Sequence, residues 1–166
     1  AFEDARGVIV NLVSGPILRH VAWITSKKGA IRANHWHPPE LRHPETNELL
    51  GTGDQWIYLL SGAYTTVACL IDADGKLHGT PETLEVRAGD LVYTPPGVAH
   101  AQYFSEDSTF LNIDGVTREH EGYDVKHTFA LKVPLIKNGT MNGADMLVTL
   151  WSVNRAGEPT YHWAAK

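Results

Sequence analysis

The sequence predicts an all-β fold, an antiparallel barrel or sandwich with little helix. Its apolar stretches are short, alternate with polar residues and are rich in β-branched and aromatic side chains, which is the pattern of half-buried strands. Fifteen glycines and nine prolines are spread along the 166 residues, so turns are frequent. No segment before residue 115 keeps the apolar period of about 3.6 residues that marks a helix. Many short strands therefore fit the chain better than a few long helices.

The expected strands are the apolar stretches that precede residue 115. Turn residues bound them, among others at Ser61-Gly62, Ala88-Gly89 and Pro95-Pro96-Gly97. Asp74-Gly75 stands between two of these stretches and indicates a hairpin. The strands are expected at 8–12, 18–25, 30–34, 55–60, 63–71, 83–86, 90–94, 101–104 and 109–113.

Two regions depart from this rhythm. Residues 38–54 form a polar stretch that is expected to be a long loop, and long loops in compact domains are lids, binding loops or disordered segments. After Gly115 the alternation is weaker. Two further strands are expected at 127–133 and 146–153, joined through 137–139 and followed by a tail at 161–163.

Length and composition bound the class of protein. A chain of 18.3 kDa that is 43 % apolar suits one domain over 1–166, with its core at about 18–114 and C-terminal strands and tail at 115–166. The formal net charge of −5 argues against a nucleic acid partner, because no basic stripe could neutralise phosphates. No run of eighteen apolar residues is present, so no membrane partner is expected.

Compartment and assembly follow from two further features. Cys69 is the only cysteine, so an internal disulfide is excluded. The N-terminus has no basic segment followed by an apolar one, and a cytoplasmic protein is therefore expected. The apolar strand patterns near both ends of the chain, 8–12 and 146–153, would cover a sheet edge or pair with a second chain, so we expect a homodimer.

Three of the nine histidines occupy informative positions. His35 and His37 are two apart at the end of the strand expected at 30–34, and residues two apart on a strand point to one face. His100 follows the run Gly89-Asp-Leu-Val-Tyr-Thr-Pro95-Pro-Gly97-Val-Ala. In that run Pro95 ends a strand and Gly97 permits the left-handed turn that starts the next one. The two neighbouring imidazoles would enter one cavity, close enough to share an ion.

The spacing of these residues resembles the two signature motifs of the cupins. The matching positions are Gly29-x5-His35-x-His37, then Gln55-x6-Gly62, then Gly89-x5-Pro95-x-Gly97-x2-His100, about half of the chain. The resemblance implies a small antiparallel β-barrel, the jelly roll, which in many members holds a divalent metal with three histidines and one carboxylate. A cavity that keeps the histidines as a catalytic base or as polar filler, without metal, is the alternative.

This sequence departs from the family at the carboxylate. The usual position, four or five residues after the second histidine, holds Leu41 and Arg42. Counting back from Gly62 places Gln55 there instead, and some metal cupins use glutamine. The resemblance thus implies the ligand set His35, His37, Gln55 and His100, with Glu40 and His43 from 38–54 as alternative ligands.

The implied ligand set is electrically neutral, which bears on its chemistry. Three imidazoles and an amide would leave one divalent ion (Fe, Mn, Ni, Zn or Co) with its full charge, so that it is a strong Lewis acid. Such a site favours non-redox chemistry on an anionic or enolate-like oxygen, as in an isomerase, epimerase or lyase. The alternatives are an Fe(II)-dependent dioxygenase and a non-catalytic cupin that binds a small molecule.

A second resemblance concerns the N-terminal part and the substrate. Asp4-Ala-Arg6-Gly7, His20-Val-Ala-Trp23 and Gly29 to His35 look like the cupin branch of nucleotide-sugar ketoisomerases and epimerases. This implies a small polar, carbohydrate-like substrate, with Arg32, Gln102 and Asn112 as candidate binding residues. Arg32 could pair with a phosphate or carboxylate, but strand parity would equally place it outward, on the surface.

Overall fold

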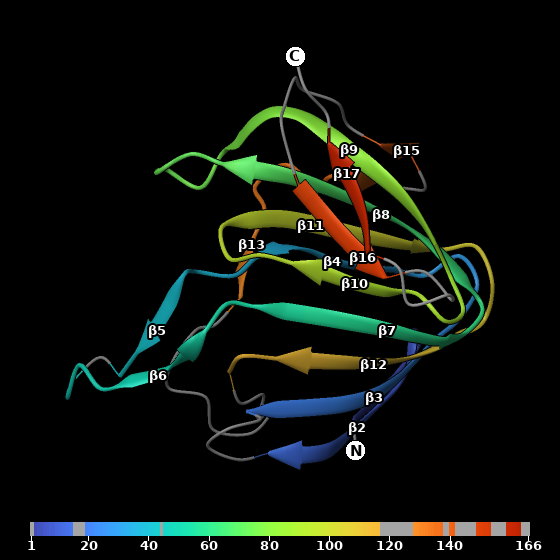
Figure 1. Ribbon diagram of the computed structural model, residues 1–166, viewed down its shortest axis with the longest axis horizontal. Helices are drawn as coiled ribbons and strands as arrows, with labels where there is room; N and C mark the ends of the chain where they lie inside the picture. The colour runs from blue at the N-terminus through green and yellow to red at the C-terminus, as the bar shows by residue number, and fades with distance from the viewer. Residues whose placement is uncertain are drawn as a thin grey trace.

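Two antiparallel β-sheets face each other in the computed structural model (Figure 1). The structure describes residues 2–14, 19–43, 45–116, 128–137, 140–141, 149–153 and 159–163, and within these ranges the regular structure is all strand. The expected all-β class is confirmed. No helix that could cross a membrane occurs in these ranges.

The larger sheet contains eight strands, and β12 and β7 lie at its middle. Each neighbouring pair is antiparallel. In spatial order the strands are β1 (Phe2–Asp4), β2 (Gly7–Ser14), β3 (His20–Ser26), β12 (Ser108–Asp114), β7 (Gln55–Ser61), β10 (Leu91–Thr94), β16 (Thr149–Val153) and β17 (Pro159–Trp163).

The smaller sheet contains five strands and carries most of the histidine motif. Its central strand, β11, lies between β4 and β8. In spatial order the strands are β13 (Phe129–Ala130), β4 (Ile31–Trp36), β11 (Val98–Phe104), β8 (Ala63–Ile71) and β9 (Leu77–Arg87). The hairpin expected at Asp74-Gly75 joins β8 to β9, and the Asp72 carboxylate accepts hydrogen bonds from the Asp74 and Lys76 amides there.

The core lies between the two sheets because alternate residues of each strand turn inward. On β7 the expected inward pair, Ile57 and Leu59, is buried, whereas Tyr58 and Leu60 are exposed. Ile57 and Leu59 share one apolar cluster with Phe110 of the same sheet and with residues of the other sheet such as Phe104. Burying these side chains contributes roughly 1.5–3 kcal/mol each, which is the main force that holds the sheets face to face.

The region 38–54 is an ordered hairpin, so the expectation of a plain loop was wrong. Strand β5 (Glu40–Arg42) pairs with β6 (Leu49–Thr52) in a separate small sheet that projects from the lower left of the body in Figure 1. Each strand is too short to display an alternating pattern in the sequence. Leu41 supplies the buried apolar side chain that attaches the hairpin to the body.

The C-terminal segment differs from its expected strands in detail. Within 127–133 the structure has the two-residue β13, and Pro134 follows shortly after, where it cannot donate to a ladder. A separate pair, β14 (Ile136–Lys137) with β15 (Thr140–Met141), occupies the position of the expected connection. The strand expected at 146–153 is observed over 149–153, and the tail 161–163 lies in β17; His127, 138–139 and 146–148 are outside the described residues.

Residues 135 and 136 of this C-terminal segment lie against the outer face of the smaller sheet. Leu135 and Ile136 are buried in a second apolar cluster with Val67, Cys69 and Ala101. These three residues alternate with the inward-facing residues of β8 and β11. The smaller sheet thus has apolar clusters on both faces, and the strands that carry the histidine motif lie between them.

Candidate metal centre

A bulge in β4 positions the first motif. His100 of β11 lies opposite His35, but the next residue, Ala101, lies opposite Ala33, so Asn34 is an extra residue in the ladder. Ala33 and Asn34 have φ angles of 62° and 56°, in the left-handed region that asparagine tolerates. The Asn34 amide exchanges two hydrogen bonds with the Ile136 backbone, at 3.1 and 3.2 Å, which stabilise the bulge.

The bulge also changes which residues of β4 face the cavity. In a regular strand Arg32 and His35, three apart, would lie on opposite faces. With one extra residue between them, both line the same cavity, and Arg32 is only 8 % exposed. The structure therefore places Arg32 inside, and not on the surface as strand parity alone suggests.

The three histidines of the two motifs gather between the sheets. The ring centroids of His35 and His37, and of His35 and His100, are each 4.8 Å apart, and those of His37 and His100 are 5.4 Å apart. One ligand atom from each ring lies within 4.8 Å of the others. His37 and His100 are buried and His35 is half-buried, so the cluster is shielded from most solvent.

Backbone contacts orient two of these residues. His100 Nδ1 lies 3.3 Å from the Val98 carbonyl oxygen, which only accepts hydrogen bonds, so an N–H on Nδ1 would donate there and Nε2 is the ring nitrogen left to bind a metal. The Gly97 amide donates to the His37 carbonyl at 2.8 Å. Gly97 has a φ of 74°, as its expected turn requires, and this contact ties the end of the first motif to the second.

Gln55 begins β7 and faces the same space from the opposite sheet. Its side chain is buried, at 4 % exposed. The amide Nε2 donates to Asp114 Oδ1 at 3.3 Å, while the buried Oε1 accepts no hydrogen bond from the described residues. Buried carbonyl oxygens are almost always satisfied, so Oε1 is chemically suited to coordinate an ion.

The donor set fits a divalent metal. In a tetrahedral site with metal–nitrogen bonds of about 2.1 Å, two imidazole nitrogens lie about 3.4 Å apart, so ligand atoms that lie within 4.8 Å of one another must move closer together to bind one ion. Imidazole and amide donors suit Fe, Mn, Ni, Zn and Co ions. The cluster of His35, His37 and His100 could thus hold a divalent metal, with Gln55 as the proposed fourth ligand.

The alternative ligands lie on the projecting hairpin and not in the cavity. The Glu40 carboxylate pairs with Arg42 at 2.9 Å, and both side chains are exposed. His43 Nδ1 accepts hydrogen bonds from the Glu45 and Thr46 amides at 3.2 and 3.3 Å, within its own turn. Neither Glu40 nor His43 lines the cavity with His35 and His100.

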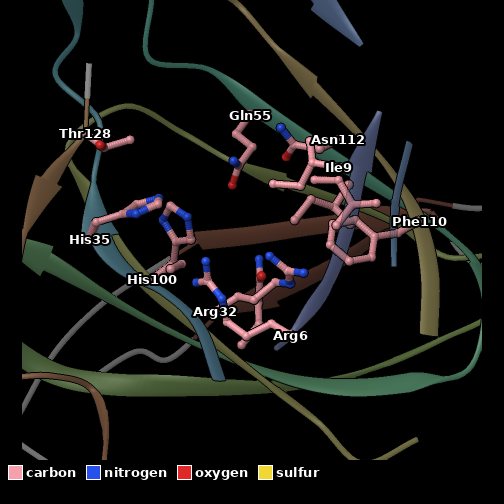
Figure 2. Close-up of a pocket in the computed structure, with 13 residues that line it drawn as sticks. Arg6, Ile9, Arg32, His35, Gln55, His100, Phe110, Asn112 and Thr128 are labelled. Atoms are coloured by element: carbon pink, nitrogen blue, oxygen red, sulfur yellow. The ribbon is translucent and has the colours of Figure 1, made fainter. Parts of the chain in front are cut away.

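A cavity of about 280 Å³ opens beside the histidine cluster. Figure 2 shows His35 and His100 on one side, Gln55 and Asn112 above, and Arg32 beside Arg6 below. No carboxylate lines it among the described residues. All three candidate substrate residues, Arg32, Gln102 and Asn112, are in the lining, which in full consists of Arg6, Ile9, Ile24, Arg32, Ala33, His35, Gln55, Ile57, His100, Gln102, Phe110, Asn112 and Thr128.

The two arginines are held by local hydrogen bonds. The Arg32 guanidinium donates to Ser26 Oγ and, at 2.7 Å, to the Thr25 carbonyl. Arg6 comes from the turn between β1 and β2, and its guanidinium donates to Asp4 Oδ2 at 2.5 and 3.0 Å. These hydrogen bonds lower the pKa of Asp4 to about 2, so the pair stays charged at neutral pH.

Two residues of the site were not predicted from the sequence: Arg6, which lines the cavity, and Asp114, which lies behind the lining. In the sequence Arg6 belongs only to the N-terminal resemblance, and nothing local indicates that its turn reaches the cavity. Asp114 ends β12, is 4 % exposed and accepts from both Gln55 and Asn112. The sequence signal that could have indicated Asp114 is its position two residues after Asn112, because residues two apart on a strand point to the same face.

Two facing antiparallel sheets, with His35, His37 and His100 gathered between them, are the architecture of a cupin, and the chain has the cupin fold. Among solved structures it is similar to CapF with the inhibitor 3-isopropenyl-tropolone, at 18 % identity and a TM-score of 0.57 over 78 % of this chain and 33 % of that one. A second structure, the capsular polysaccharide assembling protein CapF from Staphylococcus aureus, has 18 % identity and a TM-score of 0.55, and the match covers 78 % and 31 % of the two chains.

Bacillus subtilis oxalate decarboxylase is also similar, at 24 % identity in one of its mutants, with a TM-score of 0.45 over 67 % of this chain and 23 % of the other. The chain thus spans about a third of the length of CapF and about a quarter of that of oxalate decarboxylase. No family model matches the sequence, and no curated protein matches it.

Proposed function

We propose that this protein is a metal-dependent cupin enzyme that acts on a small polar, carbohydrate-like metabolite by non-redox chemistry, as an isomerase, epimerase or lyase. One observation carries the proposal. A cluster of three histidines, two of which line the cavity together with Gln55, lies beside two arginines, and no carboxylate lines the cavity among the described residues.

The charges of the lining favour an acidic substrate. A bound divalent ion would act as a Lewis acid on a substrate oxygen. Because its proposed ligands are neutral, no ligand would offset its positive charge, and an anionic group of the substrate would be attracted to it. Arg32 adds positive charge at the other end of the cavity, beside Arg6, whose charge is paired with the Asp4 carboxylate. A sugar acid or sugar phosphate would place its anionic group on Arg32, whose guanidinium plane is held by Ser26 and Thr25.

The remaining lining supports a polar substrate with one apolar side. Gln102 and Asn112 are buried amides that can hydrogen-bond hydroxyl groups. Ile9 and Phe110 form an apolar wall opposite the histidines (Figure 2). That wall excludes water from one side of the site, which strengthens the electrostatic contacts on the other.

The test begins with the metal and ends with the reaction. Metal content of the purified protein is expected to be near one equivalent. Sugar acids and sugar phosphates are then incubated with the loaded protein in D2O and followed by NMR, where an isomerase or epimerase incorporates deuterium beside the carbonyl. Arg32→Met is expected to raise KM for acidic substrates strongly, whereas the exposed Arg87→Met control should leave it unchanged.

The competing functions give different results in the same experiment. Oxygen uptake with the Fe(II)-loaded protein, accompanied by substrate loss, would identify a dioxygenase and contradict the non-redox proposal. Tight binding of a metabolite without any turnover under either condition would identify a non-catalytic binding protein.

A further inference from the structure

We propose that Asp114 is a positioning residue of the metal centre: its buried carboxylate turns the Gln55 amide oxygen toward the histidines and supplies the negative charge that the ligand set lacks. This inference rests on the proposed metal site. It assigns a role to a residue on β12, in the sheet opposite the histidines.

The strand register places Asp114 directly beside Gln55. Strand β12 lies next to β7, and the two residues are partners in the ladder. Asp114 Oδ1 accepts from Gln55 Nε2 at 3.3 Å, and Asp114 Oδ2 accepts from Asn112 Nδ2 at 2.5 Å. On its other side Asp114 is the ladder partner of His20, which is also buried. The carboxylate is therefore enclosed within the inner face of the sheet.

The carboxylate determines which end of each amide faces the cavity. An ionised carboxylate only accepts hydrogen bonds, so a neighbouring amide must turn its NH2 group toward it. The amide oxygen then points the other way. For Gln55 this leaves Oε1 buried and without a hydrogen bond from the described residues, on the side of the cavity that faces His100 (Figure 2). Without Asp114, either end of the amide could face an ion.

The same hydrogen bond carries charge toward the site. A hydrogen bond from an amide N–H to a carboxylate polarises the amide and increases the negative charge on its oxygen. Gln55 and Asp114 together thus resemble one carboxylate ligand: Gln55 would supply the oxygen that binds the ion, and Asp114, hydrogen-bonded to Gln55, supplies the negative charge. Compensation from this side can stabilise a divalent ion although no acidic side chain enters the cavity lining.

The two positions should therefore be energetically coupled. A carboxylate at position 55 would lie within hydrogen-bond distance of Asp114, and two ionised carboxylates there repel each other. Moving the charge, with glutamate at 55 and asparagine at 114, restores a donor–acceptor pair between the same side chains. If Asp114 served only to attach β12 to β7, its effect on metal affinity would not depend on the residue at 55.

A four-protein cycle tests this coupling: the unmodified protein, Gln55→Glu, Asp114→Asn and the double variant. Mn2+ and Co2+ affinities are measured by chelator competition, and the stability of the metal-free proteins by urea unfolding. Asp114→Asn is expected to weaken metal binding by about 10- to 100-fold, as losses of residues behind a ligand do. The exposed Asp74→Asn is the matched control and should change nothing.

The double variant gives the decisive comparison. Repulsion between the two carboxylates should lower the stability of metal-free Gln55→Glu, and the double variant should regain that stability. For metal affinity, we expect the loss caused by Asp114→Asn to be at least tenfold smaller with glutamate at 55, because a carboxylate there carries its own charge and presents an oxygen in either orientation. An equal loss with glutamine and with glutamate at 55, which means additive effects around the cycle, would overturn the role of Asp114. If Asp114→Asn does not fold alone, a double variant that binds metal more than tenfold more weakly than Gln55→Glu would still contradict it.

The cycle also separates this inference from the metal site on which it rests. If the unmodified protein binds metal and His37→Ala does not, but Asp114→Asn is indistinguishable from the unmodified protein, the inference about Asp114 alone is wrong. If the unmodified protein binds neither ion, the metal site and the role of Asp114 are both overturned.

Discussion

His37 is buried at the end of the first histidine motif, with its ring 4.8 Å from that of His35 and 5.4 Å from that of His100. His37→Ala is expected to lose most of the bound metal, because removing a ligand weakens a metal site far more than changing a residue behind it. Metal analysis after dialysis measures this. The exposed His78→Ala is the control, and a full equivalent of metal in His37→Ala at unchanged affinity would contradict the ligand set.

The proximity of the three motif histidines is the part of the site that the sequence predicted and the structure shows, whereas their role as metal ligands stays a prediction. His35, His37 and His100 are brought together as the motif spacing implied, because residues two apart on a strand face one side whatever the rest of the fold does. Arg6 and Asp114 were missed, since their proximity to the cavity depends on a turn and on a ladder register. Neither can be derived from the neighbouring residues in the chain.

At the scale of elements, the bulge in β4 depends on Asn34. Asn34→Ala removes both hydrogen bonds to Ile136 and a residue type that tolerates a positive φ, so we expect the free energy of unfolding to fall by about 1–3 kcal/mol. Urea unfolding measures the change. Asn47, in the exposed hairpin, also has a positive φ. Asn47→Ala should lower the free energy of unfolding by clearly less than Asn34→Ala does. Equal losses in the two variants would contradict a special role for Asn34.

The approach of residue 53 to the end of the first motif depends on a glycine. A Cβ at Gly53 would lie 2.2 Å from the Pro38 carbonyl oxygen and 2.8 Å from His37 Cβ, both far inside van der Waals contact. Gly53→Ala is therefore expected to lower both the Tm and the metal affinity, because the segment that carries His37 must shift.

Gly29→Ala is the matched control for that variant. Gly29 has a φ of 82° but no atom near the position of its absent Cβ, so alanine there should lower the Tm through backbone strain alone. Its metal affinity should remain unchanged. If Gly53→Ala bound metal as well as Gly29→Ala, the close approach would not be important for the site.

At the scale of the whole molecule, the homodimer expected from the sequence remains a prediction. Tyr58 and Leu60 are 38 % and 44 % exposed on the outer face of β7, which is an apolar surface suited to a second copy. Sedimentation is expected to give twice the chain mass of 18.3 kDa at micromolar concentration, and Leu60→Asp should lower it. Leu49→Asp, on the projecting hairpin, is the control, and a monomer at all concentrations would contradict the prediction.

The strands before residue 115 could be predicted because alternation is local. From 63–71, for example, the apolar pattern predicted β8 with the same bounds, since each residue's face is determined by its position in the pleat. The hairpin in 38–54 could not be predicted, because β5 and β6 have three and four residues and a pattern of that length is not distinguishable from a loop. The two-residue strands β13, β14 and β15 could not be predicted for the same reason.

The sequence by itself determined the all-β class, because alternation and turn residues are properties of neighbouring positions. The resemblance of its motifs to those of the cupins implied the fold and the gathering of the three histidines. Only the tertiary structure decided which face Arg32 occupies, since one bulged residue reverses the parity of β4 and is stabilised by a backbone contact to Ile136, 102 residues away. It likewise placed Asp114 behind Gln55, 59 residues away. Contacts between distant segments depend on strand order and register, which local patterns do not encode.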